Sequence, residues 1–204
     1  IHEHLEYYTL NSLNYIMKKN DLKILDVDFN NTNAGSIRVT ITHNSNDIKN
    51  VALYNKDIGE IRFKSTMDYE NKYFENPEQS LLNLKDRVDV LKNQTLELLH
   101  KLKKQGKTVL GYGASTKGNT LLQYYGIDSS IIEFIAERQV QKDGTITPGS
   151  WIKIISEEVM RKMKPDYLFV LPWHFSTEFY YREKELLKNG TKFIIPLPEL
   201  SILE

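Results

Sequence analysis

The chain has 204 residues, with 27 Lys and Arg side chains against 27 Asp and Glu side chains, and it contains no cysteine. Because the charges balance, no net field draws a polyanion, and neither nucleic acid nor a membrane surface is expected as a partner. The missing cysteines exclude a disulfide, a thiol nucleophile and a cysteine-ligated zinc site from this chain. We expect no bound metal here.

The ends of the chain and its hydropathy suggest where the protein works. No stretch approaches the roughly 18 apolar residues that a membrane span requires, and the first residues lack the layout of a signal peptide. We therefore expect a cytoplasmic protein. Because the sequence opens at Ile1 without an initiator Met, we also expect a piece of a longer protein.

The first third predicts a helix and two strands. Apolar residues recur at three- and four-residue spacings over residues 8–19, which indicates a helix, whereas residues 23–29 and 36–42 alternate as strands do. Residues 30–35 are turn-forming. The pair reads as an antiparallel edge of a sheet whose remainder lies elsewhere. Residues 43–80 show no sustained period and are predicted to be a mostly irregular connection.

The second half alternates strands with helices. Ser80 is predicted to cap a long helix that runs to about Lys104 and stops at Gly106. Beyond it we expect strands at 108–112, 131–136, 152–155, 167–171 and 192–195, with helices at 117–125, 157–163 and 177–188. This alternation is typical of βαβ units. The fold class is therefore α/β, with a small doubly wound parallel sheet over residues 107–197.

A glycine-rich loop follows the first strand of that sheet and opens its first helix. In a parallel sheet this position binds ligands, and backbone amides at a helix start attract an anion such as a pyrophosphate. The candidate residues are Gly111, Gly113, Ala114, Ser115, Thr116, Lys117, Gly118 and Asn119. The spacing matches neither a full dinucleotide fingerprint nor a Walker loop, so a simple tight turn remains the alternative.

Three other candidates follow strands of the same sheet. Glu137 stands about 20 residues after the loop, where an acid contacts a ribose hydroxyl in dinucleotide-binding folds; an ordinary strand-end carboxylate is an equal alternative. Trp173 could stack on a base or sugar and His174 could hydrogen-bond to it. A shielding Trp and a surface His explain the same residues at least as well.

The opening string His2-Glu3-His4 could ligate a metal or act as a general acid or base, although at a chain end such a string usually has no function. Its spacing alone does not decide between these readings.

Seven blocks, in order, resemble the sugar C-methyltransferases that act on deoxysugar nucleotides. They are residues 2–10, 32–39, 111–119, 142–144 with 147–149, 164–167, 171–173 and 196–199. The resemblance implies that residues 1–65 are the tail of an S-adenosylmethionine-dependent catalytic domain and 66–105 a connecting segment with a long helix. Residues 106–204 would then form a Rossmann-like carboxy-terminal domain that holds the nucleotide-linked sugar.

The resemblance also implies roles. His4 would remove the proton beside a keto group and Glu3 would orient it, while Lys142 and Pro148 would join the substrate-binding set. S-adenosylmethionine would bind mostly outside this chain, and zinc is possible in the missing amino-terminal part, which would be this chain's partner. No cofactor is expected on this chain alone, and the chain alone should be inactive. Ile1, in place of the family's Tyr, and His174, in place of its common Asn, depart from the pattern.

The sequence also allows a function without catalysis. The same sheet could belong to a non-catalytic dinucleotide- or protein-binding module, because a fold does not fix a function.

Overall fold

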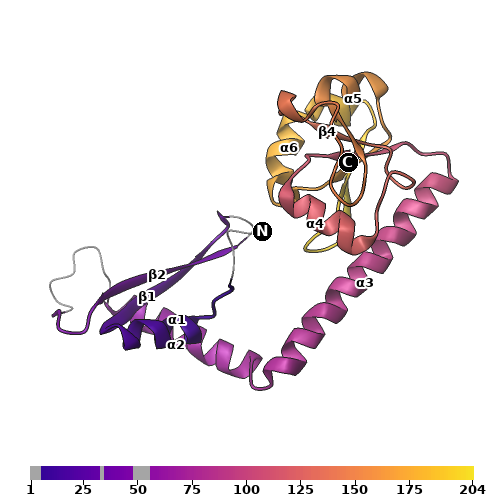
Figure 1. Ribbon diagram of the computed structural model, residues 1–204. Coiled ribbons are helices and arrows are strands. Elements are labelled where there is room, and N and C mark those ends of the chain that lie inside the picture. The colour runs from indigo at the N-terminus through magenta and orange to yellow at the C-terminus, as the bar shows by residue number, and fades with distance from the viewer. Residues whose placement is uncertain (1–5, 33–34, 48–55) are drawn as a thin grey trace. The chain divides into compact units, whose positions relative to one another are not determined.

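A computed structural model describes residues 6–32, 35–47 and 56–204 of the chain. They divide into two compact units, Ile1–Leu84 and Lys85–Glu204. Helix α3 (Pro77–Lys104) begins in the first unit and continues into the second (Figure 1). Among the described residues no helix combines the length and the apolar character that crossing a bilayer would require. His2, Glu3 and His4 lie outside the described residues.

The first unit contains the predicted helix and strand pair. Helix α1 (Leu10–Lys19) starts with a capping box between Thr9 and Ser12, strand β1 spans Leu22–Asn30, and β2 spans Ser36–His43. The strands pair antiparallel, as predicted. Leu10, Leu25 and Val27 are its buried apolar residues.

The prediction that residues 43–80 are irregular is wrong, because helix α2 occupies Lys56–Tyr73. Polar contacts help to hold this helix. The Glu70 carboxylate accepts from the backbone amides of Leu10 at 2.6 Å and Asn11 at 2.9 Å, and Arg62 Nε donates to Asp26 Oδ1 at 2.8 Å. Such contacts leave little periodic signal in the sequence.

The start of the long helix α3 also differs from the prediction. Asn76, and not Ser80, precedes the helix, and its Oδ1 accepts from the Gln79 amide at 3.1 Å. Pro77 fits the first helical position, where no amide donor is needed. Ser80 lies inside the first turn, where its hydroxyl donates to the carbonyl oxygen of Asn76 at 3.0 Å.

The second unit has the predicted layered α/β fold, and its sheet has six strands where five were predicted. Its strands are β3 (Val109–Tyr112), β4 (Phe134–Glu137), β5 (Lys153–Ser156), β6 (Tyr167–Val170), β7 (Lys192–Ile195) and β8 (Ser201–Leu203). They lie in the order β5-β4-β3-β6-β7-β8. All neighbours are parallel except β8, which pairs antiparallel with β7 and was not predicted.

Helices cover both faces of this sheet, so the side chains of its inner strands are buried and alternate between two cores, whereas β8 is exposed. The helices are α4 (Thr116–Tyr125), α5 (Glu157–Met163), α6 (Ser176–Arg182) and α7 (Lys184–Lys188), with short 3₁₀ turns at Val140–Lys142 and Trp173–Phe175. Along β6, Phe169 packs with residues of α3 and α4, whereas Leu168 and Val170 pack with residues of α5, α6 and α7. Because the side chains of a strand alternate between the two faces of the sheet, successive residues of β6 face opposite cores.

The single helix predicted at 177–188 is two helices that break at Glu183. The Glu183 side chain is only 2% exposed and binds Tyr112 and Arg161, as described below. Buried hydrogen bonds and ion pairs of this kind override local helix preference. Nothing in the local sequence signals the break.

A candidate ligand groove at the carboxyl ends of the strands

The order of strands reverses beside β3. The chain proceeds from β3 to β4 and β5 on one side and then crosses to β6 on the other. Ligands of doubly wound folds bind outside the carboxyl ends of the strands at such a reversal. The glycine-rich loop follows the carboxyl end of β3, and Pro172, Trp173 and His174 follow that of β6. Both predicted segments therefore lie at the edge where a ligand is expected.

Different structural constraints require glycine at three positions of the loop. Gly113 adopts φ +82°, a region that disfavours other residues, and a Cβ there would lie 2.5 Å from Pro172 Cγ. At Gly111 and Gly118 a Cβ would meet side chains of the neighbouring strand and loop, at 2.6 Å from Ile135 Cγ1 and 2.5 Å from Leu171 Cβ. These two positions lack side chains because the packing leaves no room.

Helix α4 opens directly from this loop. Ser115 is its N-cap, and its hydroxyl oxygen accepts from the Gly118 amide at 3.0 Å. Thr116 and Lys117 form the first turn, where backbone amides and the helix dipole favour an anion. Asn119 lies one turn further, and its Oδ1 is buried without a hydrogen-bond partner among the described residues.

A groove of about 410 Å³ runs beside the start of α4. The loop and α4 supply one wall, and the segment between β4 and β5 supplies the other. The lining residues are Ala114, Ser115, Thr116, Asn119, Lys142, Thr145, Ile146, Thr147, Pro148 and Ile154. Six of these belong to the predicted set; Thr145, Ile146, Thr147 and Ile154 were missed, because residue type gave them no chemical signal.

Lys142 connects the two walls of the groove. Its Nζ donates to the carbonyl oxygen of Ala114 at 2.8 Å and lies 3.6 Å from Glu137 Oε2. The other oxygen of Glu137 accepts from the amides of Arg138 and Gln139, each at 2.9 Å. Glu137 therefore terminates its own strand and holds a lysine at the groove.

Pro148 and His174 lie on different sides of the loop. The carbonyl oxygen of Pro148 accepts from Gln123 Nε2 at 2.9 Å, which packs the segment onto α4. His174 Nδ1 is buried and has no hydrogen-bond partner among the described residues. Burial lowers the pKa of His174, and the positive charge of Lys117 lowers it further. A neutral imidazole at neutral pH suits hydrogen bonding to a ligand. Trp173 is half-buried and packs against both cores.

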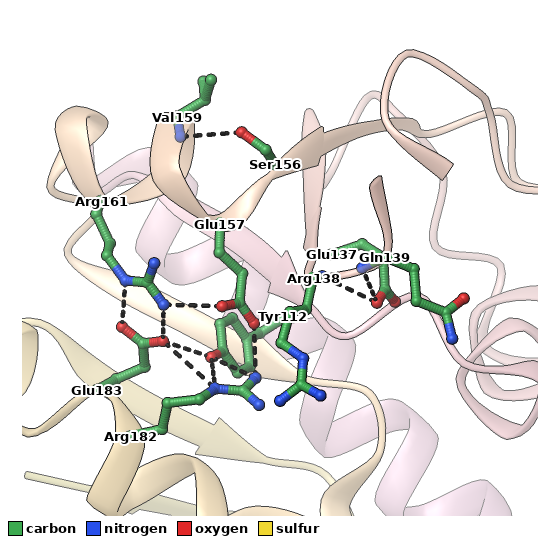
Figure 2. A network of polar contacts seen from close by, with 10 residues as sticks. All are labelled: Tyr112, Glu137, Arg138, Gln139, Ser156, Glu157, Val159, Arg161, Arg182 and Glu183. Atoms are coloured by element: carbon green, nitrogen blue, oxygen red, sulfur yellow. Dashed lines mark hydrogen bonds and ion pairs between the residues drawn. The ribbon is translucent and has the colours of Figure 1, made fainter. Parts of the chain in front are cut away.

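Behind β3 lies a buried charged cluster that sequence reasoning missed (Figure 2). Tyr112 donates from its hydroxyl to Glu183 Oε1 at 2.6 Å and accepts from Arg182 Nη2 at 2.8 Å. Arg161 bridges both oxygens of Glu183, at 2.5 and 2.9 Å, and Glu157 accepts from both arginines, at 2.8 and 2.6 Å. Only the Glu157 and Arg161 pair, four residues apart on one helix, was visible in the sequence.

The charges of the two arginines and two glutamates in this cluster balance, and the contacts shift the pKa values of Tyr112 and Glu183. Burial and the hydrogen bond to Glu183 raise the pKa of Tyr112, which stays neutral. Burial alone would raise the pKa of Glu183, but hydrogen bonds from Arg161 and Tyr112 lower it below its ordinary value. The cluster thus holds Glu183 ionised.

This shift predicts an acid-dependent loss of stability. A carboxyl whose folded pKa is lowered contributes stability above its unfolded pKa, and that contribution is lost as the pH falls through the folded pKa. We expect the free energy of unfolding in urea to fall more steeply below about pH 4.5 in the wild type than in Glu183→Gln. Parallel curves for the two proteins would contradict the assignment.

Two comparisons with known proteins show the family of the chain. The model of the C-methyltransferase C-terminal domain family matches residues 31–198, and the chain belongs to that family. The chain is 33% identical over 202 residues to the C-methyltransferase NovU of Streptomyces niveus. The match covers 99% of this chain and 46% of that relative, so the chain spans about half of the relative's length. The predicted relationship to the C-methyltransferases is confirmed.

Proposed function

We propose that the second unit holds a nucleotide-linked keto-deoxysugar for a C-methyltransferase, with the diphosphate on the loop Gly113–Lys117. The observation that supports this most directly is the groove beside the start of α4 in a chain of this family. The amides in the first turn of α4, the Lys142 ammonium and the hydroxyls of Ser115 and Thr116 are the kind of donors that a diphosphate requires. The neutral His174 and Trp173 would contact the sugar side of the ligand.

The chemistry is proposed from the family resemblance at the first residues. His4 would take the proton from the carbon beside the keto group, and Glu3 would orient the imidazole or assist the transfer. S-adenosylmethionine would supply the methyl group in the whole protein. Because we place its site mostly outside this chain, no methyl transfer is expected from these 204 residues alone.

The loop assignment can be tested by calorimetry. Titration of the chain with a TDP-hexose is expected to show saturable binding, and Lys117→Ala is expected to weaken it about tenfold, because a charge-assisted contact contributes roughly 1.5 kcal/mol. Lys162→Ala is the control, since that lysine pairs with Glu158 on the surface of α5. Absence of binding, or equal affinities for the two variants, would show that the loop does not hold the diphosphate.

A dinucleotide-binding module is the second candidate, and the strand order favours it. In local numbering the sheet reads 3-2-1-4-5-6, the order of dinucleotide-binding domains, although β8 is antiparallel. A parallel titration with NAD and NADP separates the two functions. A dinucleotide-binding module saturates with one of these ligands and not with the sugar nucleotide.

A further inference from the structure

Trp151 combines high exposure with an unfavourable backbone. Its side chain is 66% exposed, and its φ of +56° lies in the left-handed region that bulky residues rarely occupy. Such a conformation costs roughly 1–2 kcal/mol in a non-glycine residue. A Gly at this position would avoid that cost, so the fold gains nothing obvious from an indole here.

The turn that carries Trp151 fixes this conformation. The Thr147 and Ser150 side chains are buried, and their hydroxyl oxygens lie 2.7 Å apart. The Trp151 amide donates to the carbonyl oxygen of Thr147 at 3.0 Å, and the Ile152 amide donates to Thr147 Oγ1 at 3.0 Å. The backbone is therefore held by its neighbours, and the exposed ring is presented on a rigid support.

The same turn contributes to the wall of the candidate groove. Thr147 and Pro148 line the groove together with Ile146, which is itself 50% exposed. The turn packs on α4 through Gln123, eight residues after Ser115, which corresponds to about 12 Å along a helix. The groove thus has the start of α4 on one wall and Ile146, Thr147 and Pro148 on the other. Trp151 is not itself a lining residue, but it follows this wall directly in the same turn.

We propose that Trp151, with Ile146, is the platform on which the nucleobase of the bound nucleotide stacks. This inference rests on the proposed function, which places the diphosphate at the start of α4. A nucleoside diphosphate bound there would extend across the groove toward Ile146 and the turn that carries Trp151. Stacking on an indole tolerates any base, because every base presents a π-face, so Trp151 contributes affinity for the nucleoside part and not for the diphosphate.

The experiment uses variants that separate stability from binding. Trp151→Gly removes the ring and the backbone strain together, whereas Trp151→Phe keeps an aromatic ring on the same backbone. We expect Trp151→Gly to unfold at an equal or higher temperature than the wild type while binding TDP about tenfold more weakly by calorimetry. Trp151→Phe should retain most of the affinity for TDP. Inorganic pyrophosphate should bind the wild type and both variants equally.

Each other outcome overturns the inference in a recognisable way. If TDP binds Trp151→Gly as tightly as the wild type, the platform is absent and the proposed function stands. If Trp151→Gly unfolds at a lower temperature and loses affinity for TDP and pyrophosphate alike, the indole is structural. If neither ligand binds the wild type, the proposed function fails together with the platform.

Discussion

Replacing Glu183 by Ala is expected to lower the free energy of unfolding by about 3 kcal/mol, because the change leaves a buried void and removes one of the two carboxylates that Arg161 and Arg182 share. The value is placed at the low end for a broken buried pair, since the two guanidinium side chains are 42% and 25% exposed and water can partly replace the lost partner. Urea unfolding of the second unit followed by circular dichroism measures the change.

A surface pair on α5 gives the matched control. Glu158 and Lys162 form an ion pair with side chains 76% and 74% exposed, so Glu158→Ala is expected to leave the free energy of unfolding close to the wild-type value. Tyr112→Phe should fall between the two, because Glu183 keeps Arg161 but loses the phenolic donor. Equal losses for Glu183→Ala and Glu158→Ala would mean that the cluster behind β3 contributes no special stability.

Gly113→Ala is expected to destabilise the protein by about 3 kcal/mol and to disturb the loop at the same time. Two costs combine: a φ of +82° disfavours any Cβ, and that Cβ would lie 2.5 Å from Pro172 Cγ and 2.7 Å from its Cδ. Because Pro172 begins the segment that carries Trp173 and His174, both sides of the strand-order reversal must shift.

Gly106→Ala separates the two costs. Gly106 also has positive φ, at +70°, but no heavy atom lies within 4 Å of a Cβ built there. It should therefore lose only about 1 kcal/mol, from the backbone alone. Thermal unfolding of both variants measures the difference. If Gly113→Ala is no worse than Gly106→Ala, the contact between the loop and Pro172 is looser than the structure indicates.

The sequence by itself determined the layered α/β architecture of the second unit. Its buried strands and intervening helices differ in period, and those periods arise from local backbone geometry, which is written in consecutive residues. Local chemistry likewise identified the loop after β3, because Gly113 and Ser115 have the properties that a tight turn and an N-cap demand. The order of seven motif blocks added the family, which neither periodicity nor composition reveals.

Tertiary structure alone decided what depends on residues that are distant in the chain. Helix α2 is held by Glu70 and by Arg62 through partners in α1 and β1, and the break at Glu183 follows from its contacts with Tyr112 and Arg161. The second wall of the groove and the exposure of Trp151 also depend on residues that are distant in the chain. Packing and charge pairing across the fold set these features, and such contacts leave no periodic trace in a single sequence.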